Sequence, residues 1–424
     1  MPSNPSVRSL RALDSVNFFL ADVRDGVGPY LAIYLLATHH WHPSDIGLAM
    51  SVSGIAGVVA QTPAGALVDR LRAKRWLAAI AAAFVAAGCL LMVLKTTLTS
   101  VITGQIMVGV AAAVVGPGVA AITLGLVGRR RLDRRVGRNE AWNHGGNVVA
   151  AALAGLLGHY VGREYIFYLV AVMAVLSIVS VFFVREAEID HAVARGADGP
   201  AASEEPTPDT AATPAVSGLT ALLADKRVLV FSLAAVLFHF ANAAMLPLVG
   251  QRLSEGHSTG ASLYMSACII VAQLVMIGST SWAGRAASKR GRKPVLLLAF
   301  LLLPVRGVLY TLWDNPYYLV SVQVLDGIAG GIFGVVILLV VADLTKGTGR
   351  FNLVQGALGT ATGLGAALST LAAGYVVQYL GYNAAFLGLA AIAGMALVVF
   401  WLLVPETGDA PAEAPPVVPV PVLP

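Results

Sequence analysis

The chain has 424 residues, of which 57% are hydrophobic and only 12% are charged. Soluble proteins are about one-quarter charged, so this composition excludes a soluble globular domain and favours a protein with many membrane spans. The net charge of +5 does not indicate nucleic-acid binding, because the basic residues lie in loops beside apolar segments.

The N-terminal segment, residues 1–10, is polar and lacks the pattern of a cleavable signal, so we expect the first span to direct insertion. A run of about 20 apolar residues is long enough to cross a bilayer. Twelve such runs follow along the chain. The predicted spans are 13–37, 44–68, 76–96, 98–127, 139–161, 164–184, 228–251, 259–283, 294–313, 316–344, 352–379 and 383–404.

Span 1 contains Asp22, Arg24 and Asp25, and an ionisable residue inside a span usually faces a cavity or a partner. At about 100° per residue the two acids share one helix face, whereas Arg24 points away from Asp22. Paired acids are candidates for proton carriage, because like charge or desolvation raises one pKa toward neutrality. A structural ion-pair cluster that joins span 1 to span 4 or 5 is the alternative. The glycines and proline of 26–29 favour a bent segment beside these acids.

Spans 4 and 5 add polar residues at membrane depth. Gln105 lies in span 4, and span 5 carries Asn143 and Asn147 one helical turn apart. We expect both asparagines to face a polar cavity. His144 lies beside them and is interpreted either as a proton relay, since histidine titrates near neutral pH, or as a hydrogen-bonded packing residue.

The middle of the chain differs in composition from both flanks. Residues 185–227 are rich in Ala, Pro, Glu, Asp and Thr, which predicts a disordered cytoplasmic linker. The linker separates an N-terminal six-helix bundle, 1–184, from a C-terminal six-helix bundle, 228–404. Residues 405–424 are rich in proline and valine and predict a disordered tail.

The second half carries its own buried charges. Arg306 in span 9 and Asp326 in span 10 lie at similar distances from the turn that joins these spans, so we expect them at similar depth. A structural ion pair is the first interpretation, and a substrate or proton role for Asp326 is the alternative. Asn242 in span 7 and Gln355 in span 11 are further candidates for the polar cavity.

Two charged loops indicate that the chain is an internal duplication. The loop after span 2 reads Gly65-Ala-Leu-Val-Asp69-Arg70-Leu-Arg72-Ala-Lys74-Arg75, and 219 residues later the loop after span 8 runs from Gly284 through Ser288 and Arg292. The same offset of 219 aligns a second set of positions, namely Ala154, Gly155, Tyr160, Gly162 and Phe167 with Ala373, Gly374, Tyr379, Gly381 and Phe386. A constant offset over about a hundred residues predicts two related halves.

The pattern of Gly65, Asp69 and Arg70 followed by basic residues resembles the signature loop of the major facilitator superfamily of secondary transporters. The copy with Gly284 and Arg292 resembles the weaker second signature of that family. Two departures are Arg72, where the family often has glycine, and Ser288 at the position of the first loop's aspartate. The position of Gln105 is an arginine linked to proton coupling in many members. The resemblance implies that both loops form a gate between two rocking bundles.

The distribution of basic residues predicts the orientation in the membrane. Lys and Arg cluster in the loops after spans 2, 4, 8 and 10, whereas the loops on the opposite side hold only Lys95, Arg163 and Arg252. Because positive loops stay in the cytoplasm, we expect both termini there, in the cell (inner) membrane.

These observations predict an all-α membrane protein with twelve transmembrane helices in two pseudo-symmetric bundles. We expect a proton-coupled secondary transporter of a small organic solute that works by alternating access, with efflux as the favoured direction. The alternatives are an importer of a small metabolite or anion, and a non-transporting receptor or sensor on the same scaffold. The expected partners are lipid, a small solute and protons, with no nucleic acid. No enzymatic activity, cofactor or metal is expected, and we expect a monomer.

Overall fold

The computed structural model of the chain describes residues 5–23, 27–128, 131–195, 225–256, 260–346 and 351–407. At Asp22, Asp69, Asp133, Arg195, Phe351 and Asn352 it describes the backbone alone. Every regular element within these ranges is a helix.

The first half consists of long apolar helices that run back and forth. They are α1 (Val7–Val23), α2 (Pro29–His39), α3 (Pro43–Arg70), α4 (Lys74–Leu94), α5 (Leu98–Val127), α6 (Leu132–Tyr160) and α7 (Tyr165–Phe183). The predicted span 1 is divided into α1 and α2. The break lies where the sequence has Gly28, with φ 45°, and Pro29, as the glycines and proline of this stretch predicted.

The second half repeats this arrangement. Its helices are α9 (Lys226–Ala243), α10 (Met245–Gly256), α11 (Ala261–Arg290), α12 (Arg292–Leu309), α13 (Pro316–Leu344) and α14 (Phe351–Leu403). Together α9 and α10 form one span. The 53-residue α14 contains two spans, because Gly381 at φ 83° leaves the helical conformation inside it.

Eight of the described helices are long and apolar enough to cross a membrane by length and composition, and α14 counts once among them. The remaining predicted spans do not meet these criteria of length and composition, for identifiable reasons. Span 1 is divided into two short helices, α6 begins with a polar stretch, and α12 carries Arg292, Lys293 and Arg306. The predicted twelve-span architecture is confirmed.

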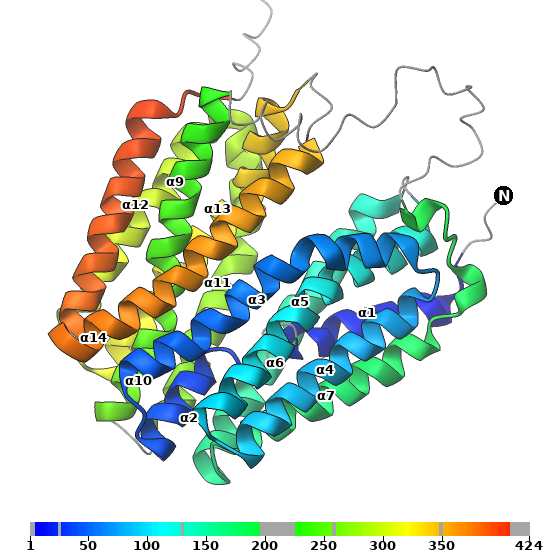
Figure 1. The fold of residues 1–424 in the computed structure, drawn as a ribbon. Coiled ribbons are helices and arrows are strands. Elements are labelled where there is room, and N and C mark those ends of the chain that lie inside the picture. Colours follow the sequence, from blue (N-terminus) through cyan, green and yellow to red (C-terminus); the bar gives the residue numbers. More distant parts are fainter. Residues whose placement is uncertain are drawn as a thin grey trace, which may run out of the picture.

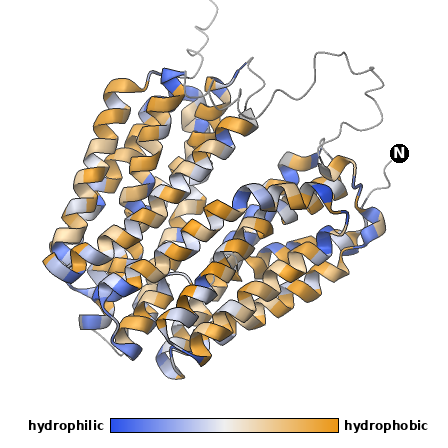
Figure 2. Ribbon diagram, viewed as in Figure 1, coloured by the Kyte–Doolittle hydropathy of each residue, from blue (hydrophilic) through white to orange (hydrophobic). Residues whose placement is uncertain are grey.

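The helices form two bundles, one from each half of the chain, that lie side by side (Figure 1). Apolar residues dominate the flanks of the helices, and polar residues gather toward their ends (Figure 2). We call the end where α3 and α5 finish and α6 begins the termini face, because the described chain also starts and stops there. The bundles meet through α2 with α10, α3 with α14, and α6 with α11.

The contacts between the bundles follow the sequence duplication. A Cβ atom at Gly155 on α6 would lie 2.3 Å from Ser266 Oγ on α11. A Cβ atom at Gly374 on α14 would lie 2.9 Å from the Cα of Gly47 on α3. The offset of 219 relates position 155 to 374 and position 47 to 266. The same close approach therefore occurs twice, related by the pseudo-symmetry of the two halves.

The start of the predicted linker is folded, in contrast to the expectation from its composition. Two short 3₁₀ helices, η2 (Glu186–Glu188) and η3 (Val193–Arg195), place Ile189 and Ala194 against Gly125 at the end of α5. The Asp190 backbone N–H donates to the Gly125 carbonyl at 3.0 Å. The apolar residues between the acidic ones supply this contact. Residues 196–224 and the tail after 407 lie outside the described residues.

The folded linker segment is also tied to the N-terminal segment. The Ser6 backbone N–H donates to Glu188 Oε2 at 2.9 Å, and the Arg185 backbone N–H donates to Ser9 Oγ at 3.1 Å. Burial by itself would raise the pKa of Glu188, but hydrogen bonds from Ser6 and Ser9 and the charge of Arg185 hold this pKa below its ordinary value. Glu188 is therefore held as a carboxylate at neutral pH.

Candidate functional site

A cavity of about 930 Å³ lies between the N-terminal bundle and the start of α14. Its walls come from α1, α3, α5 and α6, with Ala194 of η3 at the termini face. At about 1.5 Å per helical residue, the α5 wall extends about 18 Å inward, from Val127 to the level of Val115. The cavity is within the range of about 300–1,000 Å³ typical of small-molecule sites.

A second cavity of about 380 Å³ continues between α3, α5 and α14 and shares Gly116 and Pro117 with the first. Proline has no N–H, so Pro117 leaves the Ala113 carbonyl without its helical hydrogen bond. Both Ala113 and Pro117 line this second cavity. The two cavities together connect the termini face with the region between the bundles.

Polar side chains from α1, α5, α6 and α14 line the larger cavity. These residues are Asn17, Thr123, Asn139, Glu140, Asn143 and Gln355. The sequence predicted two of them, Asn143 and Gln355, as cavity residues. The third predicted amide on α6, Asn147, donates from Nδ2 to Asn143 Oδ1 at 3.4 Å and so lies one turn deeper.

A charge cluster that the sequence analysis did not predict joins α1 to α6 beside this polar lining. Arg135 Nη2 donates to Asp14 Oδ1 at 2.8 Å, and Arg138 Nη2 donates to Asp14 Oδ2 at 2.6 Å. Arg135 Nε also donates to Asn139 Oδ1 at 2.9 Å, and Asn139 Nδ2 donates to Thr123 Oγ1 at 3.1 Å. The available signal was an acid near one end of span 1 and two arginines in the loop at the same membrane face.

The acids predicted for proton carriage are not placed by the structure. Arg24 and Asp25 lie outside the described residues, and Asp22 is described by its backbone alone, near the end of α1. The neighbouring Leu20 lines the larger cavity. Their role stays a prediction.

Two other predicted polar residues do not line the described cavities. His144 Nδ1 lies 2.7 Å from Gln273 Oε1 on α11, so this histidine joins the two bundles. Gln105 is buried, and its Nε2 donates to the Ala49 carbonyl on α3 at 3.3 Å. Gln105 thus links α5 to α3 within the N-terminal bundle.

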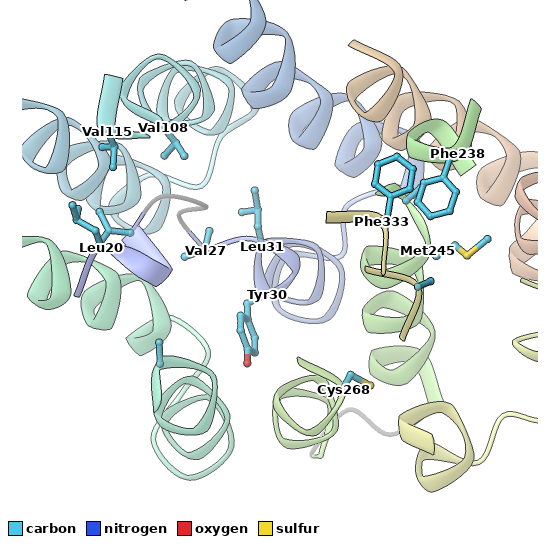
Figure 3. Close-up of a cluster of buried hydrophobic side chains, with 14 of the residues drawn as sticks. Leu20, Val27, Tyr30, Leu31, Val108, Val115, Phe238, Met245, Cys268 and Phe333 are labelled. Carbon is cyan, nitrogen blue, oxygen red and sulfur yellow. The ribbon is translucent and has the colours of Figure 1, made fainter. Parts of the chain in front are cut away.

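The predicted ion pair of Arg306 with Asp326 is confirmed. Arg306 Nη2 also donates to Asn242 Oδ1 and lies 3.2 Å from Met245 Sδ, so Asn242 belongs to this pair. The Arg306 side chain is 3% exposed and that of Asp326 is 20% exposed. In the same bundle, Phe238 and Phe333 stack with ring centroids 4.3 Å apart (Figure 3). The C-terminal bundle therefore holds a charged pair within an aromatic and apolar core.

In the first signature loop, Gly65 lines the larger cavity and Arg70 is exposed, while the side chain of Asp69 is not described. Lys74 is fully buried, and its Nζ donates to the Val68 carbonyl at 2.7 Å. This contact places a positive charge at the C-terminal end of α3, where the helix dipole favours it. Arg75 pairs with Glu186 of η2.

In the second signature loop, Arg292 Nε lies 3.3 Å from Asp343 Oδ2 on α13, and Arg292 Nη1 donates to the Ala287 carbonyl at 2.8 Å. The backbone N–H groups of Arg292 and Lys293 donate to the Glu406 carboxylate. Gly284 lies on α11, and a Cβ atom there would lie 3.8 Å from Val335 Cγ1 on α13. Each signature loop is thus held by a glutamate that follows the last span of its own half.

The bundles are closed on each other away from the termini face. The hydroxyl of Tyr30 on α2 and Oγ of Ser266 on α11 are 2.7 Å apart. Figure 3 shows Tyr30 directed away from Leu20 and Val115 of the N-terminal bundle. A Cβ atom at Gly250 on α10 would lie 3.2 Å from Ile33 on α2. Near the termini face, by contrast, Leu67 of α3 and Leu353 of α14 are exposed.

The family profile and the named relatives that match this chain point to the same family. Residues 13–303 and 271–424 match the profile of the family described as Major Facilitator Superfamily. Two relatives from Mycobacterium tuberculosis, strains CDC 1551 and H37Rv, are each named an uncharacterized MFS-type transporter. Each is 48% identical over 402 residues, which is 95% of this chain and 94% of the relative.

Solved structures share the fold at low sequence identity. A mutant of the nucleoside transporter NupG aligns with a TM-score of 0.72 and 19% identity, covering 92% of this chain and 99% of that one. A D-xylose–proton symporter aligns with a TM-score of 0.69 and 13% identity, covering 95% and 98%. These similarities are evidence for the helical arrangement.

Proposed function

Because the chain belongs to the major facilitator superfamily and is a multi-pass secondary transporter rather than an enzyme, we propose that it carries a small organic solute in exchange for protons. Both the class of solute and the use of protons as the coupling ion belong to this proposal. The observation that best supports a carrier mechanism is the 930 Å³ cavity, which lies at one membrane face while the bundles touch at the other. A site accessible from one side at a time is what alternating access requires.

The proposed cycle is a rocking motion of the two bundles. The contact of Tyr30 with Ser266 and the approach of Gly47 to Gly374 would separate when the opposite side opens. The signature loops at Asp69 and Arg292 would then approach the other bundle and close the termini face.

The orientation is proposed from the basic residues. Lys and Arg cluster at the termini face, and positive loops remain in the cytoplasm. The described conformation would then face the cytoplasm, the state in which an exporter loads its solute and an importer releases it. We propose export as the direction.

Coupling is proposed to run through Asp22 or Asp25, at the break between α1 and α2. A carboxylate there could alternate between a proton and a contact with the solute. Asp326 is the second candidate, because it is partly exposed while its partner Arg306 is buried. Protonation of Asp326 would weaken this pair and leave Arg306 bound to its other partner, Asn242.

The test is solute flux in proteoliposomes with an imposed pH gradient, screened over a panel of small organic solutes. We expect a solute whose flux follows the gradient in the wild type and loses that dependence in Asp25→Asn or Asp22→Asn. Asp45→Asn, an acid in the first turn of α3, is the matched control and should behave as the wild type. A transported solute whose flux ignores both the gradient and these substitutions would remove proton coupling.

A further inference from the structure

One acid in the larger cavity has no described partner. Among the described residues that line this cavity, Glu140 is the one with a titratable side chain. It is exposed to the cavity, and the described part of the chain offers it no ion pair and no hydrogen bond. A carboxylate without a partner at the wall of a solute-sized cavity is free to attract a positive ligand.

Two described arginines near Glu140 on α6 are engaged by another carboxylate. Arg135 and Arg138 lie on the side of α6 that faces α1, and both are bound to the Asp14 carboxylate. Neither arginine lines the cavity, and the Arg138 side chain is 58% exposed to solvent. Glu140 lies on another face of α6, together with Val136 and Asn143.

The amides beside Glu140 present a definite pattern of donors and acceptors. Asn17 Nδ2 donates to the Leu13 carbonyl at 2.7 Å, and among the described residues no group donates to Asn17 Oδ1. Asn143 Oδ1 accepts from Asn147 Nδ2, and the Asn143 NH₂ group has no acceptor within the described part of the chain. The two acceptors, Glu140 and Asn17, suit a ligand with a charged N–H donor, and Asn143 suits an acceptor on the same ligand.

We propose that Glu140 makes this cavity selective for cationic solutes that carry an amine. Asn17 and Asn143 flank the ammonium group, and the apolar residues of α5 contact the remainder of the ligand. An inorganic or organic anion is disfavoured, because a free carboxylate repels it where no described cation lines the wall. This inference rests on the proposed carrier function and narrows its substrate class.

The test measures the charge preference of the cavity with two defined reagents. In the full-length Gln355→Cys protein, a thiol on the α14 wall reports on the same cavity. Its modification rate is measured with a trimethylammonium-ethyl and with a sulfonato-ethyl methanethiosulfonate. The two native cysteines, Cys89 and Cys268, are fully buried and give little background.

The cation-to-anion rate ratio is expected to exceed that of free 2-mercaptoethanol about five-fold at low ionic strength and to fall with added salt. Adding Glu140→Gln should return the ratio to that of the free thiol. Glu255→Gln, which changes a carboxylate on α10 that does not line this cavity, should leave the ratio unchanged.

The outcomes separate this inference from the carrier function. A thiol that reacts without charge preference, or a preference that survives Glu140→Gln, would overturn the assignment of Glu140 and leave an accessible carrier cavity. A thiol that reacts with neither reagent would contradict the open cavity itself, and with it the proposed function.

Discussion

At the scale of single residues, the two halves bury their charges in different ways. The N-terminal bundle holds Asp14 between two arginines, so the carboxylate accepts charged hydrogen bonds at both oxygens. The C-terminal bundle holds Arg306 against one acid, one amide and a thioether. A buried charge is costly without such partners, and each cluster therefore fixes the helices that supply them.

The pair of Arg306 and Asp326 gives a direct test of this cost. Arg306→Met should lower the stability by roughly 3 kcal/mol or more, because it leaves Asp326 without its partner inside the bundle. The double variant with Asp326→Leu should recover most of the loss, since it removes the orphaned charge. The measurement is the midpoint of thermal unfolding of the purified protein in detergent. A double variant less stable than Arg306→Met would contradict this assignment.

At the scale of elements, glycine positions determine how closely the helices pack. A Cβ atom at Gly109 on α5 would lie 2.1 Å from the Ser53 carbonyl oxygen on α3. A Cβ atom at Gly327 on α13 would lie 2.5 Å from the Ala272 carbonyl oxygen on α11. These distances are far below van der Waals contact, and both obstacles are backbone atoms. The two halves thus use a similar close crossing, with the glycines 218 residues apart and the facing residues 53 and 272 separated by 219.

Alanine substitution at these crossings should separate the helices. We expect Gly109→Ala and Gly327→Ala each to reduce stability by about 1–3 kcal/mol, because the added methyl group meets a backbone carbonyl. Gly118→Ala on α5 and Gly334→Ala on α13 are matched controls, since a Cβ atom there meets nothing within 4 Å. The measurement is the midpoint of thermal unfolding of all four variants under the same conditions. Equal effects at the crossings and the controls would show that packing is not the cause.

At the scale of the whole molecule, the bundles touch at one membrane face and leave a cavity at the other, which is one of the two states of the alternating-access cycle proposed above. Gly158 on α6 and Ser262 on α11 lie at the closed face, where a Cβ atom at Gly158 would be 2.8 Å from the Ser262 Cβ. This contact crosses between the bundles. If the bundles rock, it has to open once in every transport cycle.

Cross-linking this contact should arrest the cycle. The double variant Gly158→Cys with Ser262→Cys is expected to form a disulfide under mild oxidation, after a small backbone shift. Solute flux in proteoliposomes should then fall to background and return on reduction. Gly158→Cys alone, treated with the same oxidant, is the control for the substitution. Continued flux at complete cross-linking would exclude rocking about this contact.

Sequence patterns alone were enough to predict the number of spans, the duplication, the break in span 1 and the pairing of Arg306 with Asp326. Each depends on composition, on spacing along one helix, or on the antiparallel turn between neighbouring spans, and these are local properties. Asn143 and Gln355 were also found, because few polar residues occur in spans.

Only the tertiary structure decided which polar residues share a cavity. The packing of α1 against α6 pairs Asp14 with Arg135 and places Asn17 and Glu140 in the lining of one cavity. His144 instead contacts Gln273 on the other bundle. The folded start of the linker likewise depends on a surface offered by α5 and the N-terminal segment. Apolar periodicity says which residues cross the membrane, but nearly every face of a spanning helix is apolar. The rotation of each helix about its axis is therefore set by its neighbours.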